Sequence, residues 1–256
     1  MLKNMKGERI LSRIVLILYE YMAAVANTPK KKCNCLSCEL RNLVFTNLDV
    51  EDVEHICDAK EEISYAKGEI IHNEGDPISD FKYLKTGLVK LYRATSDGDE
   101  QIITITRPFE FVSNTNIFHE EKYRYSLSAL EDSVVCCIPI NLVKELIISN
   151  GKFALSLISA LSKTAEDIIS LGLEIRKRNL AGRTAFVLLY FSNEIYHSRI
   201  FDLPVSRKEI ADLISMSSAN VIRTFSEFRR DGIIRANGRT IEISDMNKLE
   251  VISRRG

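Results

Sequence analysis

The densest group of chemically reactive side chains in the sequence is a set of cysteines near the N-terminus. Cys33, Cys35 and Cys38 follow a C-x-C-x-x-C pattern, which rarely arises by chance. Thiolates are good ligands for zinc and for iron–sulfur clusters, and neighbouring thiols also form redox pairs. The pattern is therefore compatible with a metal site, with a redox thiol pair, or with the relic of a lost cluster.

A second group of functional side chains follows Pro204 and consists of short polar and basic residues. Its members are Ser206, Arg207, Lys208, Ser217, Ser218, Asn220, Arg223, Asn237 and Arg239. Such side chains at a helix start suit the phosphates and base edges of a DNA major groove. From Pro204 onward there are 10 Lys and Arg against 7 Asp and Glu, whereas the whole sequence balances at 35 and 35. Because the surplus is modest, selective binding is expected to need two copies of this module.

Two short helices and a hairpin are predicted to position these side chains. Ser206 is a good N-cap, and Glu209, three residues further on, completes a capping box. A second helix is predicted by apolar residues at three- and four-residue spacing, namely Val221, Ile222, Phe225 and Phe228. Asn237-Gly238 lies between two isoleucine-rich runs, which predicts a tight hairpin. Together these elements predict a winged helix-turn-helix, although similar patterns also occur in domains that never contact DNA.

The region from Ser64 to Pro139 has the pattern of an all-β domain. Short runs of β-branched and aromatic residues are separated by turn signals such as Thr86-Gly87, which predicts a sandwich or roll. An acidic helix over residues 48–59 precedes these strands. Its apolar side, formed by Leu48, Val53 and Ile56, is expected to pack on the sheets.

Residues 141–179 have a helical period, with an expected break at 149–151. Small and aliphatic residues recur every three or four positions, as in a heptad seam, namely Ala154, Ile158, Leu161, Ala165, Ile168, Gly172 and Ile175. We expect this helix to pair with a second copy of the chain. The alternative is a long helix that lies on its own domain.

Composition predicts an ordinary globular protein, since 45% of its 256 residues are hydrophobic. The expected organisation is an N-terminal extension (1–32), a sensor domain (33–150), a dimerisation helix (151–179) and a DNA-binding domain (180–256). The six cysteines do not form the ladder of a secreted disulfide scaffold, so a cytoplasmic protein is expected. In residues 1–32, Glu20 interrupts the apolar run and Arg13 lies at its edge, which argues against a signal peptide or a membrane span. Met22 is an alternative start of the chain.

Four longer motifs follow one another along the chain in an order that is typical of one protein family. They are GEIIHNEGD, YLKTGLVKLY followed by DGDEQI, ALEDSVVCCIP, and SRKEIADLISMSSANVIRTFSEFRRDGII. From about Cys33 to its end the chain resembles the Crp/Fnr family of bacterial transcription regulators. The resemblance implies an α+β fold with an N-terminal cyclic-nucleotide-binding-like β-roll, a long dimerisation helix and a C-terminal winged helix-turn-helix. It also implies a homodimer that binds double-stranded DNA with two half-sites and contacts RNA polymerase.

The resemblance assigns roles to the residues of the DNA-binding module. The phosphate-gripping positions match Ser206, Arg207 and Lys208. The base-contacting positions match Ser218, Ala219, Asn220 and Arg223, and Asn237 and Arg239 in the wing look similar to backbone contacts. The best-known members have Glu where this chain has Ala219, so the operator is expected to differ from theirs, with Arg223 as the reader of guanine.

The resemblance also suggests what the protein does not sense. Cyclic-nucleotide binders of the family have Gly-Glu and Arg-Ser pairs, where this chain has Ser113-Asn114 and Tyr125-Ser126. Arg124 is displaced by one position, which on a strand would send it to the opposite face. Cyclic AMP is therefore not expected, and Asn114, Tyr125 and Ser126 are candidates to line a pocket for another ligand.

The oxygen-sensing branch of the family holds an iron–sulfur cluster with three N-terminal cysteines and a fourth in the roll. Cys136 occupies the matching place in the roll, so Cys33, Cys35, Cys38 and Cys136 are the candidate ligands of a cluster or of zinc. The family spacing would put a cysteine at Val44, so Cys33 would have to substitute for it. Cys57 and Cys137 are expected to be buried apolar residues.

These observations favour a DNA-binding regulator that responds to a redox or small-molecule signal. The competing hypothesis is a signalling module that acts through protein partners. No arrangement of nucleophile, base and orienting group supports an enzyme.

Overall fold

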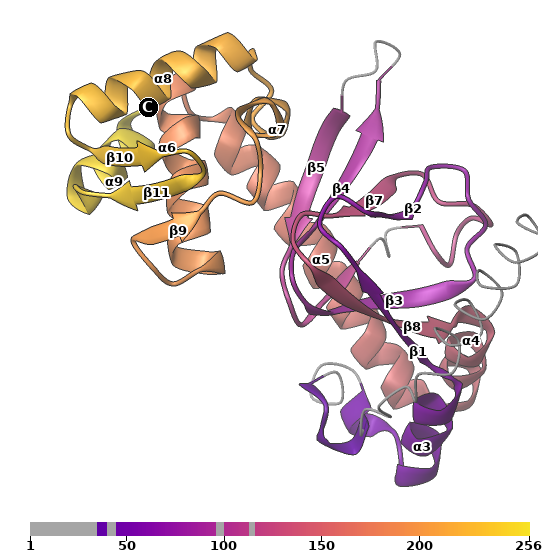
Figure 1. Cartoon of the computed structure of the whole chain (residues 1–256). Helices are drawn as coiled ribbons and strands as arrows, with labels where there is room; N and C mark the ends of the chain where they lie inside the picture. The colour runs from indigo at the N-terminus through magenta and orange to yellow at the C-terminus, as the bar shows by residue number, and fades with distance from the viewer. Residues whose placement is uncertain (1–34, 40–44, 96–99, 113–115) are drawn as a thin grey trace, which may run out of the picture. The chain divides into compact units, whose positions relative to one another are not determined.

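The computed structural model of the chain describes residues 35–39, 45–95, 100–112 and 116–256 (Figure 1). The predicted extension 1–32 and two predicted site residues, Cys33 and Asn114, lie outside these ranges. Residues 34–256 form one unit. Its described part combines antiparallel sheets with helices, so the predicted α+β fold is confirmed.

In the described part of the chain, three helical segments precede the sheets, namely η1 (Cys35–Ser37), η2 (Phe45–Asn47) and α3 (Val50–Ala59). Asp49 caps α3, since its side chain accepts a hydrogen bond of 2.9 Å from the backbone N–H of Asp52. The side of the helix formed by Leu48, Val53 and Ile56 is buried in one core with the strands, as predicted.

The roll consists of two four-stranded antiparallel sheets. One contains, in spatial order, β1 (Glu61–Tyr65), β8 (Ser133–Pro139), β3 (Asp80–Thr86) and β6 (Glu110–Val112). The other contains β2 (Ile70–His72), β7 (Ser126–Ala129), β4 (Val89–Ala94) and β5 (Glu100–Thr106). The β-rich stretch starts three residues earlier than predicted, because β1 begins with two glutamates that carry no strand signal.

Gly87 joins β3 to β4 with a φ of +86°, a conformation that glycine adopts without strain. A Cβ atom there would lie 2.5 Å from the carbonyl oxygen of Asp132 and 2.7 Å from Cα of Ser133. Because both neighbours belong to the loop and strand behind the turn, neither can move cheaply. Gly87→Ala is therefore expected to lower the free energy of unfolding by about 3 kcal/mol, as measured by urea denaturation.

Gly68 provides the matched control for this prediction. It has nearly the same φ, +85°, but a Cβ atom there would meet nothing within 4 Å. Gly68→Ala should cost only the backbone strain, about 1 kcal/mol. Equal losses in the two variants would show that the close approach of residues 132 and 133 to Gly87 is not decisive.

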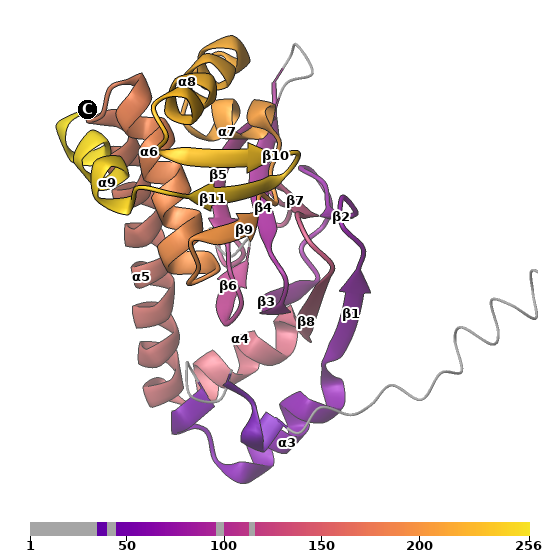
Figure 2. The same cartoon turned by 60° about the vertical axis from the view of Figure 1, so that its left-hand side comes forward.

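Two helices follow the roll, α4 (Ile140–Ser149) and α5 (Gly151–Arg176). The predicted break lies at Asn150, whose side-chain oxygen accepts a hydrogen bond of 3.0 Å from the backbone N–H of Phe153. Phe153 and Leu157 anchor the start of α5 in the core that also holds α3. Beyond them α5 continues as a single long helix towards α6 (Figure 2).

The C-terminal region contains α6 (Leu180–Tyr190), a π-turn η3 (Phe191–Ile195), β9 (Ile200–Asp202), α7 (Arg207–Leu213), α8 (Ser218–Arg230), β10 (Ile234–Asn237), β11 (Thr240–Ile243) and α9 (Met246–Arg255). Strands β10, β11 and β9 form a small antiparallel sheet. The hairpin at Asn237-Gly238 was predicted, whereas β9 and α9 were not. Among the described residues, no helix has the length and apolar character needed to cross a membrane.

Candidate nucleic-acid interface and sensor sites

The first helix of the candidate interface, α7, starts as the sequence predicts. The Ser206 hydroxyl accepts a hydrogen bond of 3.1 Å from the Glu209 backbone N–H, and the Glu209 carboxylate accepts one of 2.7 Å from the Ser206 N–H. The reciprocal pair is a capping box, which satisfies two N–H groups at the helix start. In the same way, the Ser217 hydroxyl caps α8 by accepting from the Asn220 N–H at 3.3 Å. Ser217 therefore positions α8, in addition to any contact it makes with DNA.

Helix α8 presents one face to the protein core and another to solvent. The buried face consists of Val221, Thr224, Phe225 and Phe228. The exposed face includes Ala219, Ile222, Arg223 and Ser226. Ile222 was predicted to lie on the buried face, but this prediction is wrong, because its side chain is 53% exposed. Thr224 faces the core instead. An exposed isoleucine beside Arg223 is of the type that contacts a thymine methyl group.

The three residues predicted to contact phosphates, Ser206, Arg207 and Lys208, differ in how exposed their side chains are. The guanidinium of Arg207 lies 3.8 Å from the centre of the Phe225 ring, and burial, followed by the charge of Arg239, holds its pKa below the usual value. Arg207 therefore packs against α8 of its own domain. Ser206 and Lys208 are exposed at the start of the helix.

The wing contains the predicted hairpin, and Arg239 makes contacts within the protein that were not predicted. Asn237 pairs with Thr240 across the turn, and Gly238 has a φ of +59°. The guanidinium of Arg239 donates to the carbonyl oxygens of Leu203 (3.0 Å) and Pro204 (2.7 Å). In this form Arg239 ties the wing to the segment before α7, whereas a DNA backbone contact was expected. Asn237 remains exposed at the tip.

The roll contacts the start of α7 through Lys90 of β4. Its ammonium group donates to the carboxylate of Glu209 at 2.7 Å and also to that of Glu100. Burial favours the neutral amine, but the hydrogen bonds to Glu100 and Glu209 outweigh it, so the pKa of Lys90 lies above its usual value. Because Glu209 also caps α7, this ion pair links the roll to the first helix of the interface.

Three of the four predicted thiol ligands lie near one another on the roll. Cys35 and Cys136 are each 4% exposed in the core that contains α3, and Cys38 packs on the same core. Burial raises the pKa of the Cys35 and Cys136 thiols. Thiol ligands suit zinc and iron–sulfur clusters in type, but the described residues include no group of three or more such side chains arranged to hold a metal ion. The fourth, Cys33, lies outside the described residues.

The predicted ligand-pocket residues in the roll have structural roles. The Ser126 hydroxyl is buried and accepts a hydrogen bond of 2.9 Å from the backbone N–H of Glu74. Tyr125 packs against the core between the two sheets, and the Arg93 guanidinium lies 5.3 Å from its ring centre. Arg124 lies at the surface and donates to Glu120 at 2.6 Å, although it sits in a bend before β7 and not on a strand. Arg124 therefore points to solvent because of the bend, and not because side chains alternate along a strand.

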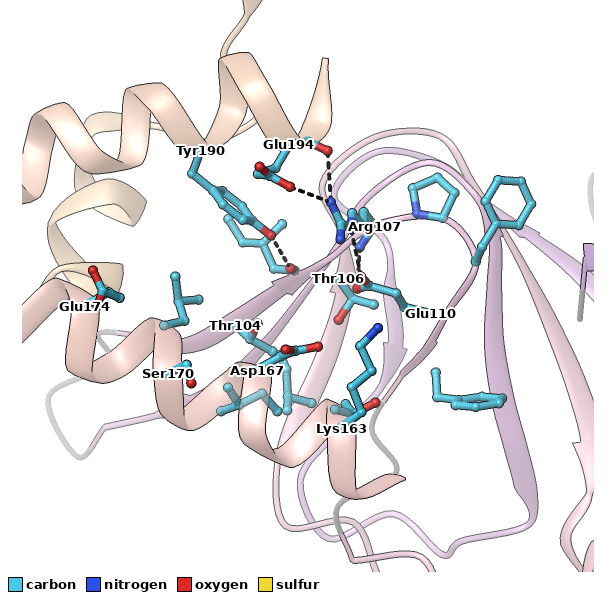
Figure 3. Close-up of a pocket in the computed structure, with 18 of the residues that line it drawn as sticks. Thr104, Thr106, Arg107, Glu110, Lys163, Asp167, Ser170, Glu174, Tyr190 and Glu194 are labelled. Carbon is cyan, nitrogen blue, oxygen red and sulfur yellow. Dashed lines mark hydrogen bonds and ion pairs between the residues drawn. The ribbon is translucent and has the colours of Figure 1, made fainter. Parts of the chain in front are cut away.

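A cavity of about 710 Å³ lies elsewhere, between β5, β6, α5 and α6 (Figure 3). At one end Arg107 donates to Glu110 at 2.8 Å and to Glu194 at 3.2 Å. From α5, Lys163 and Asp167 project into the cavity, and neither has an ion-pair partner among the described residues. Neither Tyr125 nor Ser126 lines it. A largely apolar cavity with both charges at its wall is a candidate small-molecule site that no local sequence pattern indicated.

Helix α5 carries an exposed apolar face that overlaps the predicted seam only in part. Leu155, Ile158, Ile169 and Leu173, here named the α5 stripe, are each 59–70% exposed. Of the predicted seam, Ile158 and Ala165 lie on this face, while Leu161, Ile168 and Gly172 are only partly exposed. Ile175 is 5% exposed and packs with α6, so its assignment to the seam is corrected.

A β-roll followed by a long helix and a winged helix-turn-helix is an arrangement found in DNA-binding transcription regulators. Residues 62–150 match the cyclic nucleotide-binding domain family, and residues 182–252 match the Crp-like helix-turn-helix domain family. The chain belongs to the Crp/Fnr family of transcription regulators.

Individual relatives agree with this assignment. Transcriptional activator protein FnrA of Stutzerimonas stutzeri is 27% identical over 222 residues, which cover 84% of this chain and 91% of that protein. Electron transport regulator A of Shewanella oneidensis is 26% identical over 228 residues, 86% of this chain and 90% of that protein. The structure of FixK2 from Bradyrhizobium japonicum shares the fold, with a TM-score of 0.67, 23% identity and coverage of 75% of this chain and 96% of that chain.

Proposed function

We propose that the chain acts as a homodimer that places two copies of α8 in successive major grooves of an operator with two half-sites. The observation that carries this proposal is the exposed face of α8, where Arg223 stands between polar and apolar side chains of types that read base edges. Ser206, Lys208 and Asn237 surround it with groups that suit phosphates. In this proposal, sensing, pairing and DNA binding belong to three regions: the roll (33–150), the dimerisation helix (151–179) and the DNA-binding domain (180–256). The family resemblance further suggests that the protein contacts RNA polymerase and is located in the cytoplasm.

The α5 stripe supports the dimer. It places four large aliphatic side chains on one face of a 26-residue helix, and such a face is expected to be covered by a partner. A second copy of the same helix presents the same face, so a two-fold symmetric pair covers both stripes at once. Pairing would also set the spacing of the two α8 helices on DNA.

The signal is proposed to be a redox change or a small molecule other than cyclic AMP. Two observations support this choice: the thiols gathered around Cys35, and the cavity beside Lys163 and Asp167. The places where cyclic-nucleotide binders have Glu and Arg hold Asn114 and Tyr125 here. The name of one relative, an electron transport regulator, is in keeping with a redox signal.

Cys33, Cys35, Cys38 and Cys136 are the proposed ligands if the redox sensor holds an iron–sulfur cluster or zinc. Four thiolates can hold either group, and a bound cluster would supply a one-electron redox centre. Anaerobic purification, followed by a visible absorption spectrum and iron and zinc analysis, tests this set. A colourless, metal-free dimer that still binds DNA would exclude the metal.

The DNA-binding proposal is tested by selection of sequences from a randomised DNA library with the purified chain. We expect enrichment of an inverted repeat whose half-site centres lie about one helical turn, or about 10 base pairs, apart. Ala219 and Ile222 predict thymine near the guanine that Arg223 reads. The proposal fails if no sequence is enriched at any salt concentration, because non-specific phosphate contacts alone give no enrichment.

A further inference from the structure

The C-terminal ends of α5 and α7 meet at one side chain, that of Arg183 in the first turn of α6. Its Nε atom donates to the carbonyl oxygen of Arg178 at 2.8 Å, and Nη2 donates to that of Arg176 at 3.3 Å. Nη1 donates to the carbonyl oxygen of Ile214 at 3.0 Å, and the Met216 sulfur lies 3.6 Å from the same nitrogen. Arg183 therefore contacts the end of α5 on one side and the turn between α7 and α8 on the other.

These hydrogen bonds satisfy backbone groups that a helix cannot satisfy by itself. The last carbonyl groups of an α-helix have no N–H partner within the helix, and they carry its partial negative charge. Arg176 ends α5 and Ile214 is the C-cap of α7, so the negative ends of two helices meet one guanidinium. A guanidinium has five N–H donors in a rigid planar fork, whereas the lysine ammonium is a compact point charge. An arginine can therefore hold both helix ends at once, and a lysine cannot.

The turn that Arg183 holds leads directly into α8. Its last residue, Ser217, caps α8 through its hydroxyl. The turn is also tightly bonded to α7, because the N–H groups of Ser215 and Met216 donate to carbonyl oxygens of that helix at 3.3 and 2.9 Å. A turn fixed at both of its ends and hydrogen-bonded to Arg183 makes the start of α8 follow the end of α5, the helix that carries the α5 stripe.

We infer that Arg183 is a positioning residue that fixes the direction of α8 relative to α5, and thereby the spacing of half-sites that the dimer accepts. The inference rests on the proposed function, because this spacing has a meaning only for two α8 helices held by paired α5 helices. Arg183 contacts no base in this role. Without it each DNA-binding domain still recognises a half-site, but the two domains are no longer held at one separation.

The test uses the full chain, its selected operator, and duplexes whose half-sites lie one base pair closer together or further apart. One base pair changes the separation by about 3.4 Å and rotates one half-site by about 35°. A rigid dimer then loses the base contacts of one half-site, so the parent protein should prefer its own spacing by roughly 5-fold to 150-fold. In Arg183→Lys this preference should fall at least about threefold, while the affinity for a duplex with a single half-site stays the same. Fluorescence anisotropy measures both affinities.

Lys177→Ala is the matched control for this variant. Lys177 follows the end of α5 directly, but its side chain is 59% exposed and pairs with Glu174, so its loss should leave the spacing preference unchanged. An unchanged preference in Arg183→Lys, or an equal loss of preference in Lys177→Ala, would overturn the inference. A parent protein without any spacing preference would overturn the proposed dimer on two half-sites, and this inference with it, so the two failures are distinguishable.

Hydrogen exchange followed by mass spectrometry separates positioning from stability and needs no DNA. In Arg183→Lys, peptides that contain the amides of Ser215 and Met216 should exchange faster than in the parent protein, because the turn has lost its tie to the end of α5. Peptides from the β10–β11 hairpin should keep their protection. Faster exchange throughout residues 180–256 would show that Arg183 supports the fold of the whole domain and not the placement of α8, and that result would also overturn the inference.

Discussion

Arg223→Ala is expected to remove most of the preference of the protein for its operator over unrelated DNA. A bidentate contact from arginine to guanine contributes about 1–3 kcal/mol of discrimination, and a dimer makes it twice. The expected loss is therefore about 2–6 kcal/mol, or roughly 30-fold to 10⁴-fold in the ratio of specific to non-specific affinity. Fluorescence anisotropy with operator and scrambled duplexes measures this ratio directly.

The structure indicates that this loss would not come from misfolding. The Arg223 side chain is 65% exposed, and its ion pair with Glu227 is long at 3.9 Å. An exposed pair of this kind contributes little to stability, so the variant should unfold at nearly the same urea concentration as the parent protein.

Arg254→Ala is the matched control, because it removes the same charge from an exposed position on α9, where Arg254 pairs with Glu250. It should leave the ratio of specific to non-specific affinity unchanged. If Arg223 contacted phosphate instead of a base, its loss would weaken all sequences equally and would lower the salt dependence by about one counterion per copy. That result would contradict the assignment of Arg223 as a base reader.

Local rules were enough to predict the helix-turn-helix from the sequence. The capping box of Ser206 and Glu209, the turn at Asn237-Gly238 and the break at Asn150 each depend on residues within a few positions. Their geometry is set by backbone hydrogen bonds that close locally, so the pattern of residue types determines it.

The errors arise where a residue's environment is set by an element that is distant in the sequence. Ile175 fits a heptad, but α6 folds back and buries it. Ile222 fits an amphipathic pattern, but Thr224 faces the core instead, and its hydroxyl is satisfied by the carbonyl oxygen of Asn220 at 3.0 Å. The hydrogen bonds from Arg239 to two carbonyl groups near Pro204 were likewise not predicted, while its contact with DNA stays a prediction. The periodicity of apolar residues predicts which face of a helix is apolar, but it does not predict which other element packs against that face.

Sequence patterns also missed neighbours in the sensor region, where contacts between distant elements bring side chains together. The C-x-C-x-x-C pattern identified Cys35 and Cys38 because they are close in sequence. Cys57 comes next to Cys35 only because α3 packs against η1, and no spacing rule links the two positions. The cavity beside Lys163 depends likewise on the packing of α5 against β5 and β6.

Ile169→Glu is expected to convert the proposed dimer into a monomer. Ile169 is 62% exposed in the single chain, so the glutamate is tolerated there, whereas a paired α5 stripe would bury two like charges against apolar side chains. Loss of the two buried isoleucines alone weakens association by about 3 kcal/mol or more, which is at least about 100-fold in the dimer dissociation constant. Sedimentation equilibrium measures this constant, and affinity for the two-half-site operator should fall with it.

Two substitutions separate this effect from a general one. Ile148→Glu, on α4, places the same charge at an isoleucine that is 85% exposed and lies off the α5 stripe, so the dimer should persist. Ile175→Glu, at a position that is 5% exposed, should instead destabilise the fold, because the charge is buried against α6. If Ile169→Glu left the dissociation constant unchanged while Ile148→Glu raised it, the dimer contact would lie on α4, and the α5 stripe would need another partner.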